Sequence, residues 1–184
     1  MIFGLFRRSH DDDDVRTIYS GIMAHARHPA FYERYGVPDT LDGRYDMLML
    51  HAFLYLHRLK TEPETAREQG QKVFDLMFLE MDRALREIGV GDLAVPKKIK
   101  KMASAFYGRT AAYDEALSGT GGELAEALGR NIYPEEGAEH APLLARYVRH
   151  AAEVLAAQDL TVLVREGPSF PDPAPFAEQK SAAL

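Results

Sequence analysis

Seven histidines are the side chains in this sequence best suited to metal binding or acid–base chemistry. His25 and His28 are three residues apart near the end of an expected helix, a spacing that two metal ligands can use. No third ligand accompanies them, and a histidine near a helix C-terminus is favourable in its own right. His51 and His57 are six residues apart on another expected helix, so they lie on different faces and cannot both reach one ion. We therefore expect no metal site and no cofactor.

An acid–base pair is the remaining catalytic arrangement. His51 or His57 would serve with Asp75 or Glu80 if the two groups met in a closed, buried pocket. The structural alternative places His51 at the core edge with a hydrogen-bonded ring. The carboxylates then pair along the helix surface with nearby arginines, the residues concerned being Asp75, Glu80, Asp82, Arg83 and Arg86. The sequence contains no G-x-S-x-G, Walker, G-x-G-x-x-G or H-E-x-x-H motif, so none of these signatures supports an enzyme.

The clearest charge feature is a group of four lysines at the start of an expected helix, namely Lys97, Lys98, Lys100 and Lys101. Positive charge is unfavourable there because the helix dipole is itself positive at its N-terminus. An anionic partner would neutralise it: a phosphate backbone, a lipid head group or an acidic peptide. The simpler alternative is a solvated face that adds solubility.

Composition narrows the function classes before any element is placed. The chain has 184 residues, the length of one domain, and no cysteine, which excludes disulfides, thiolate zinc sites and iron–sulfur ligation. The net charge of -6 argues against binding nucleic acid over the whole domain, and we expect no specific DNA contact.

Hydrophobic periodicity predicts an all-α fold, a single-domain bundle of about six helices. The expected helices cover residues 15–26, 41–60, 64–88, 96–118, 123–132 and 141–158, with a short aromatic turn at 31–36. Thr40 or Asp39 should cap the second, while Thr61 with Glu64 and Thr120 with Glu123 have capping-box spacing. Residues 160–164 should be extended or helical. The predicted organisation is an N-terminal tail (1–14), a helical domain (15–164) and a Pro-rich extended tail (165–184).

The N-terminus has its apolar residues before its basic ones, the reverse of a signal peptide, and no segment is long enough to cross a membrane. We therefore expect a cytoplasmic protein. A docking or frayed terminus is the simpler interpretation of the first residues. The alternative is a weak contact with a membrane surface through Phe3, Leu5, Phe6, Arg7 and Arg8, which the following acidic run 11–14 would oppose.

Four sequence strings resemble the ubiquinol–cytochrome c chaperone family: LHAFLYLHRL (50–59), GRTAAYDEAL (108–117), LAEALGRNIY (124–133) and YVR (147–149). The resemblance covers residues 35–160. In the family pattern, Trp stands where this chain has Phe53 and Gly129. The resemblance implies a non-enzymatic assembly factor for the cytochrome bc1 complex that handles new cytochrome b. Mitochondrial relatives associate with the translating ribosome and a small partner protein. A bacterial-looking chain would act in the cytoplasm, near or peripherally on the inner membrane.

Two interpretations of the binding surface follow. An all-α binding module should offer an open groove or patch flanked by lysines. Methionines, which adapt to varied partners, would suit such a surface, unless they simply fill the core. The methionines concerned are Met47, Met49, Met77, Met81 and Met102. We expect partner contacts at the four lysines and at Tyr107, Arg109, Arg130 and Asn131. The expected partner is cytochrome b or a bc1 assembly intermediate, and the ribosome is a further candidate. Arg109 and Arg130 come from the resembling strings, and both could instead pair with carboxylates such as Asp114. The alternatives are the small helical enzyme above and a ribosome- or nucleic-acid-binding module.

Overall fold

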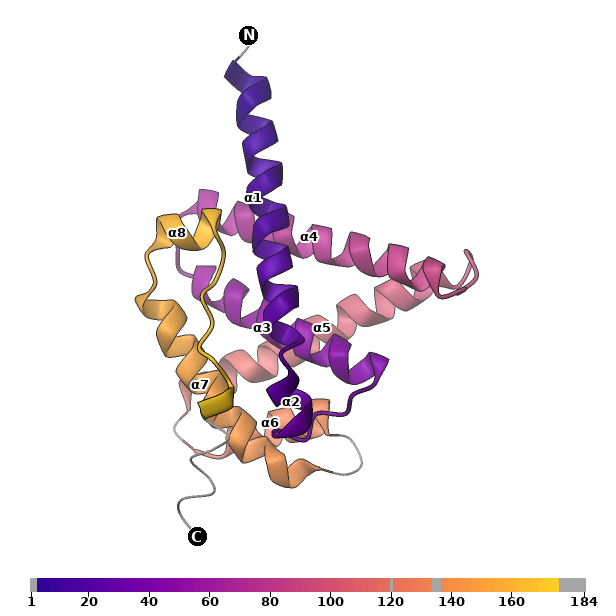
Figure 1. Cartoon of the computed structure of the whole chain (residues 1–184), viewed down its shortest axis with the longest axis vertical. Helices are drawn as coiled ribbons and strands as arrows, with labels where there is room; N and C mark the ends of the chain where they lie inside the picture. Colours follow the sequence, from indigo (N-terminus) through magenta and orange to yellow (C-terminus); the bar gives the residue numbers. More distant parts are fainter. Residues whose placement is uncertain (1–2, 120, 134–136, 176–184) are drawn as a thin grey trace.

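The computed structural model describes residues 3–119, 121–133 and 137–175, with side chains from residue 12 onward. They form one all-α domain without a strand in the described ranges, as predicted. The helices, drawn in Figure 1, are α1 (Phe3–Ala26), α2 (Pro29–Glu33), α3 (Leu41–Leu59), α4 (Glu64–Glu87), α5 (Val95–Ser118), α6 (Glu123–Ile132), the 3-10 turn η1 (Ala138–His140), α7 (Ala141–Ala157) and α8 (Leu160–Arg165). Six of these have ten or more residues. None of the described helices combines the length and apolar character that crossing a bilayer requires.

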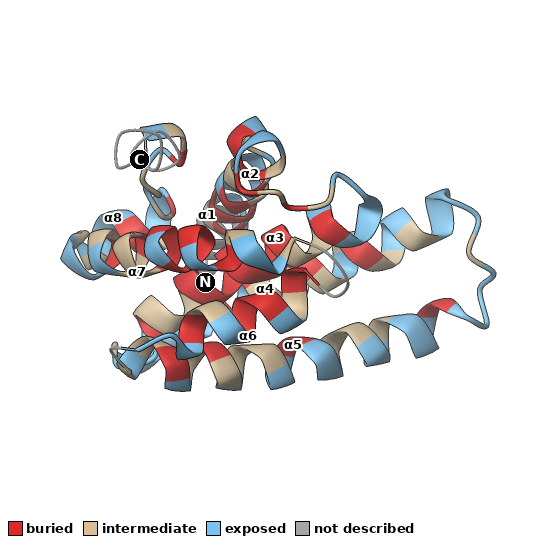
Figure 2. Cartoon of the chain, turned by 90° about the horizontal axis from the view of Figure 1, so that it is seen from below, coloured by how far each residue is buried: buried red, intermediate tan, exposed pale blue. Residues whose placement is uncertain are grey.

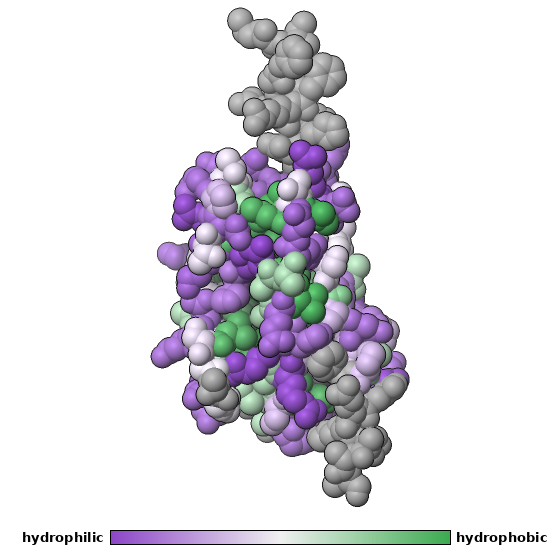
Figure 3. All heavy atoms as spheres, turned by 90° about the vertical axis from the view of Figure 1, so that its left-hand side faces the viewer, coloured by the Kyte–Doolittle hydropathy of each residue, from purple (hydrophilic) through white to green (hydrophobic). Residues whose placement is uncertain are grey.

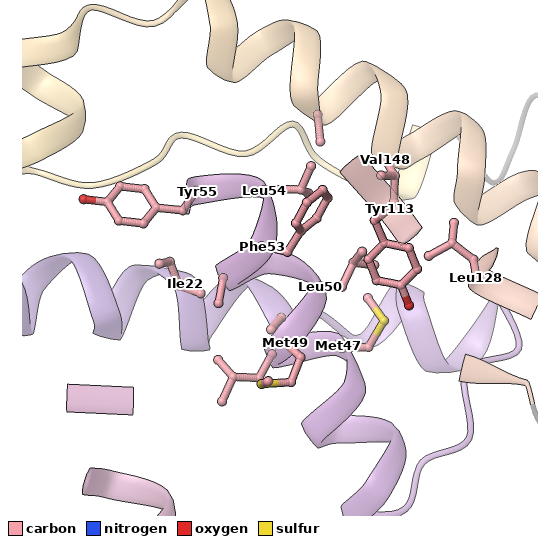
Figure 4. Close-up of a cluster of buried hydrophobic side chains, with 14 of the residues drawn as sticks. Ile22, Met47, Met49, Leu50, Phe53, Leu54, Tyr55, Tyr113, Leu128 and Val148 are labelled. Carbon is pink, nitrogen blue, oxygen red and sulfur yellow. The ribbon is translucent and has the colours of Figure 1, made fainter. Parts of the chain in front are cut away.

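Helix α3 is the centre of the fold and packs against α1, α4, α5, α6 and α7. It is buried on nearly all sides because its sequence is apolar on two faces. Figure 4 shows its side chains from Met47 to Tyr55 meeting Ile22 of α1, Tyr113 of α5 and Val148 of α7. The Thr40 hydroxyl caps the helix by accepting the Gly43 N–H at 3.1 Å, as predicted.

The other expected capping boxes are not observed. Helix α4 begins after Pro63, which has no side-chain capping bond, so the predicted Thr61–Glu64 box is wrong. Pro63 has no side-chain acceptor, and its carbonyl accepts the Ala66 N–H at 2.9 Å and the Arg67 N–H at 3.2 Å. Thr120 lies outside the described residues, and α6 begins after Gly122 without a side-chain cap.

Helix α1 begins twelve residues earlier than its periodicity suggested, at Phe3 and not at Val15. The acidic run 11–14 therefore lies inside the helix and not at its N-terminus. The side chains of residues 1–11 are outside the described set, so the proposed membrane contact of Phe3, Leu5 and Phe6 stays a prediction.

Four of the five methionines named in the sequence analysis fill the core. Met47, Met49, Met77 and Met81 are buried, and Met102 is half-buried against the same core. The simple core interpretation is therefore correct for the four buried methionines, which cannot line a client surface.

Residues 166–175, which we call the strap, run back from α8 along the body (yellow in Figure 1); the strap is extended over most of its length and becomes helical at residues 174–175. Helix α8 shows that residues 160–164 are helical, capped by Asp159. The strap is anchored where the Tyr35 hydroxyl donates to the Pro173 carbonyl at 2.8 Å. Gly167, with φ +96°, turns the chain toward Ile18. The extended tail is thus a packed element up to residue 175, and residues 176–184 lie outside the described set.

Helices α4 and α5 form a hairpin whose distal end projects from the body (Figure 1). Figure 2 shows this end and the connection between the helices as mostly exposed. By contrast, the face bearing α7 and α8 is mostly hydrophilic, with small separate hydrophobic areas (Figure 3). The hairpin therefore carries an exposed tip that projects away from the compact body.

Candidate functional site

An open groove of about 590 Å³ lies between α3, α4 and α5. Its apolar lining comes from Phe53, Leu56, Leu59 and Phe106, and Tyr107 stands on its edge with 60% of its surface exposed. The spacing of Phe53, Leu56 and Leu59 places them on adjoining turns of α3. Phe53 meets Tyr113 of α5 with ring centroids 5.5 Å apart, and Leu56 and Leu59 lie against Gly70 of α4. A groove of this size and lining suits an apolar side-chain cluster or a helical segment of a partner.

One wall of the groove carries a charged cluster that joins α3 to α5. Asp114 accepts hydrogen bonds from Lys60 Nζ at 2.5 Å and from His57 Nδ1 at 2.8 Å. The Lys60 hydrogen bond is the main cause that lowers the pKa of the Asp114 carboxyl, and the His57 hydrogen bond adds to it. The cluster is half-exposed, so one edge of the otherwise apolar groove is hydrated.

The structure does not form the acid–base pairs considered from the sequence. Asp75 accepts from Gln71 Nε2 at 2.7 Å, and Glu80 binds Arg83 at 2.6 Å, so neither carboxylate meets a histidine. His57 instead binds Asp114, whose charge Lys60 already neutralises.

The hydroxyl of Thr110, which also lines the groove, donates to the Tyr107 carbonyl within its own helix. His57 therefore has no prepared nucleophile to activate among the lining residues.

His51 belongs to a second, closed cluster in the core, as a hydrogen-bonded core histidine. It is fully buried, and its Nδ1 donates to the Met47 carbonyl at 2.8 Å, which leaves Nε2 as an acceptor for the Tyr147 hydroxyl at 3.2 Å. The Tyr147 oxygen can then accept from His25 Nε2 at 2.8 Å. Burial lowers the pKa of His25 to about 4 and that of His51 to about 3, so both rings are neutral.

The strap closes this cluster from outside. Phe170 stacks on His25 with ring centroids 4.9 Å apart and meets His51 edge-on at the same distance. The cluster is consequently a sealed polar element of the core. Among the described residues no group of three histidines or carboxylates is placed to hold a metal ion.

The predicted contact residues fall into separate places. The four lysines are exposed on the outer side of α5, near its distal end. Arg109 lies eight residues beyond Lys101, about 12 Å along the helix axis at 1.5 Å per residue. It is half-buried and pairs with Asp46 of α3, not with Asp114 as considered from the sequence. Burial raises the pKa of Asp46, and the Arg109 hydrogen bond opposes that effect.

Arg130 and Asn131 lie at the C-terminal end of α6. Arg130 is exposed, 3.9 Å from Glu126, while Asn131 donates to the Ala127 carbonyl at 2.8 Å. The structure therefore does not bring all eight predicted residues into one surface. Of these eight residues, Tyr107 lines the groove, and partner contact by all eight stays a prediction.

The strings that carry the family resemblance meet at helix ends. Arg149 of α7 donates to the Gly119 carbonyl at 2.8 Å and also to the carbonyls of Ala116 and Leu117, satisfying the C-terminus of α5.

The ubiquinol-cytochrome C chaperone family matches residues 33–170, three quarters of the chain.

This chain belongs to that family. It is 42% identical to the chain in the crystal structure of the Cbp3 homolog from Brucella abortus, with a TM-score of 0.83, covering 95% of this chain and 98% of that one. Ubiquinol-cytochrome-c reductase complex assembly factor 1 of Xenopus laevis is 24% identical over 77% of this chain and 72% of its own length. The mouse assembly factor 1 is 26% identical over 75% of this chain, which spans about half (48%) of the mouse protein.

Sequence reasoning expected an open groove or patch flanked by the α5 lysines, but it missed the place of the groove between α3, α4 and α5, and it missed the packing of the strap. The groove had a signal, since Phe53, Leu56, His57 and Lys60 share one side of α3. The strap had none, because its proline content suggested only an extended tail.

Proposed function

We propose that this protein is an assembly chaperone for the cytochrome bc1 complex, binding nascent or unassembled cytochrome b without catalysing a reaction. The observation that carries the proposal is family membership, together with relatives named as assembly factors of ubiquinol-cytochrome c reductase. We also propose that the protein acts in the cytoplasm, near or peripherally on the inner membrane.

The groove supports a binding role. It is open, has an apolar floor and is bordered by the exposed ring of Tyr107, an arrangement suited to an apolar helical segment. Its charged cluster is internally neutralised and lacks an activated nucleophile, which favours binding over chemistry. The lysines of α5 offer a second contact surface for an anionic partner, with Arg130 and Asn131 as further predicted contacts.

The client test is a pull-down of cytochrome b from detergent-solubilised membranes with Tyr107→Glu. A charge placed on the groove edge should lower recovery about tenfold, since it would have to be buried against an apolar segment. Leu79→Glu is the matched control, because Leu79 is an exposed apolar residue (49%) on α4 that does not line the groove. Equal recovery with both variants would exclude the groove as the contact.

The function itself is tested in cells. Deleting the gene should reduce the amount of assembled bc1 complex, and the wild-type gene should restore it. A normal amount of complex in the deletion strain would refute the assembly role, whatever the groove binds.

A further inference from the structure

The connection between α4 and α5, residues 88–94, lies at the distal end of the hairpin and is mostly exposed (Figure 2). We call this segment the hairpin tip. Leu93 has 97% of its surface exposed and Ile88 61%. The Gly89 N–H donates to the Arg86 carbonyl and the Val90 N–H to the Leu85 carbonyl, so a capping turn with Gly89 at φ +87° orders the start of the tip.

Two exposed apolar residues alone are common on soluble proteins. The adjoining charge distinguishes this place. Lys97, Lys98, Lys100 and Lys101 are all exposed, and none forms an ion pair within the part of the chain that the structure describes. At 100° per residue they cover the side of α5 opposite the half-buried Ile99. We call these four residues the lysine face.

The local charge is opposite in sign to that of the whole chain. Residues 86–101 contain five cations and two carboxylates, a net charge of +3, whereas the chain carries -6. One of the two carboxylates, Asp92, is bound to Arg86 at 2.6 Å and so does not neutralise the lysines. The hairpin therefore ends in an apolar tip followed directly by unneutralised positive charge.

We propose that the hairpin tip docks on the surface of an anionic lipid bilayer, with Leu93 and Ile88 inserted at the level of the head groups and the lysine face against lipid phosphates. A bilayer accepts a convex apolar tip without a complementary pocket, and its negative surface potential attracts clustered lysines. Lysines on an RNA backbone would account for the charge, but not for the exposed Leu93, because single-stranded nucleic acid is bound through aromatic stacking.

Docking in this way brings the groove close to the membrane. Tyr107 lies ten residues after Lys97 on α5, about 15 Å along the axis. On the basis of the proposed function, an apolar segment leaving or entering the bilayer would meet the groove without crossing a long aqueous gap.

The test is flotation of the purified full chain with vesicles. Neutral vesicles contain phosphatidylcholine alone, and anionic vesicles contain about one third phosphatidylglycerol. We expect binding to anionic vesicles only, weakened by added salt. The double variant Lys97→Glu/Lys98→Glu should weaken it at least about 25-fold, since each lysine near such a surface strengthens binding about fivefold. Leu93→Ser should weaken it about tenfold.

Matched controls separate the site from general charge and folding. Arg27→Glu/Arg165→Glu makes the same charge change at exposed positions outside the hairpin, and Leu79→Ser removes an exposed leucine elsewhere on α4. Both should float like the wild type. The proposal is overturned if the wild type does not float with anionic vesicles, or if the lysine variant and its control float alike.

Leu93→Ser also separates this proposal from the client function. It should weaken flotation about tenfold while leaving the recovery of detergent-solubilised cytochrome b unchanged, because Leu93 does not line the groove. The proposal would be overturned if this variant floated like the wild type and the wild type bound an oligouridine more tightly than the vesicles. That pair of results would assign the lysine face to RNA.

Discussion

Mild acid should destabilise this protein through His25 and His51. Both rings are neutral in the fold, since burial lowers the pKa of His25 to about 4 and of His51 to about 3. In the unfolded chain both titrate near pH 6.5. The unfolded state therefore binds more protons below that value, so stability is complete above about pH 7 and falls as the pH drops through 6.5 toward 4 and 3.

The magnitude follows from the two titration curves. Between about pH 8 and about pH 5, protonation of the unfolded chain costs about 2 kcal/mol of stability for each histidine, or about 4 kcal/mol together. Ordinary carboxylates contribute little in this range because they titrate near pH 4. The window above pH 5 thus isolates the histidines.

Urea unfolding followed by circular dichroism at a series of pH values measures this loss. In the double variant His25→Gln/His51→Gln, the decrease in unfolding free energy between pH 8 and pH 5 should be smaller by about 4 kcal/mol than in the wild type. His150→Gln, on the half-exposed side of α7, is the matched control that replaces a histidine outside the cluster. An equal decrease in the double variant would refute the assignment of the acid sensitivity to the sealed cluster.

Three further predictions concern a buried ion pair, two helical glycines and the strap. Arg109→Ala should lower the free energy of unfolding by about 3–5 kcal/mol, because it leaves Asp46 buried without its partner. Adding Asp46→Asn should recover part of that loss in the same urea assay. If nothing is recovered, the pairing of Arg109 with Asp46 is contradicted. Gly43→Ala should cost about 1–3 kcal/mol, since its Cβ would lie 2.0 Å from a backbone carbonyl oxygen. Gly21→Ala, with nothing within 4 Å, should instead raise the melting temperature. Phe170→Ala should raise the pKa of His25 from about 4 in an NMR titration, because that ring is depressed mainly by burial; an unchanged value would show that the strap does not seal the cluster.

The sequence by itself determined the helical class and the bounds of α3, α5 and α7 to within one or two residues. Helix periodicity and stop signals are local, so the 3.6-residue repeat and residues such as Pro96 and Gly89 are sufficient. The start of α1 was missed, because the four aspartates resemble a helix N-terminus although the structure carries them inside the helix.

The tertiary structure decided which charged groups meet. His57 and Asp114 are 57 residues apart in sequence, and Phe170 reaches His25 across most of the chain. Helical spacing fixes which residues share a face but not which helix packs against that face, so Asp46 and not Asp114 became the partner of Arg109. The hairpin tip shows the same division: the four lysines are plain in the sequence, but only the way α4 and α5 project left Leu93 exposed beside them.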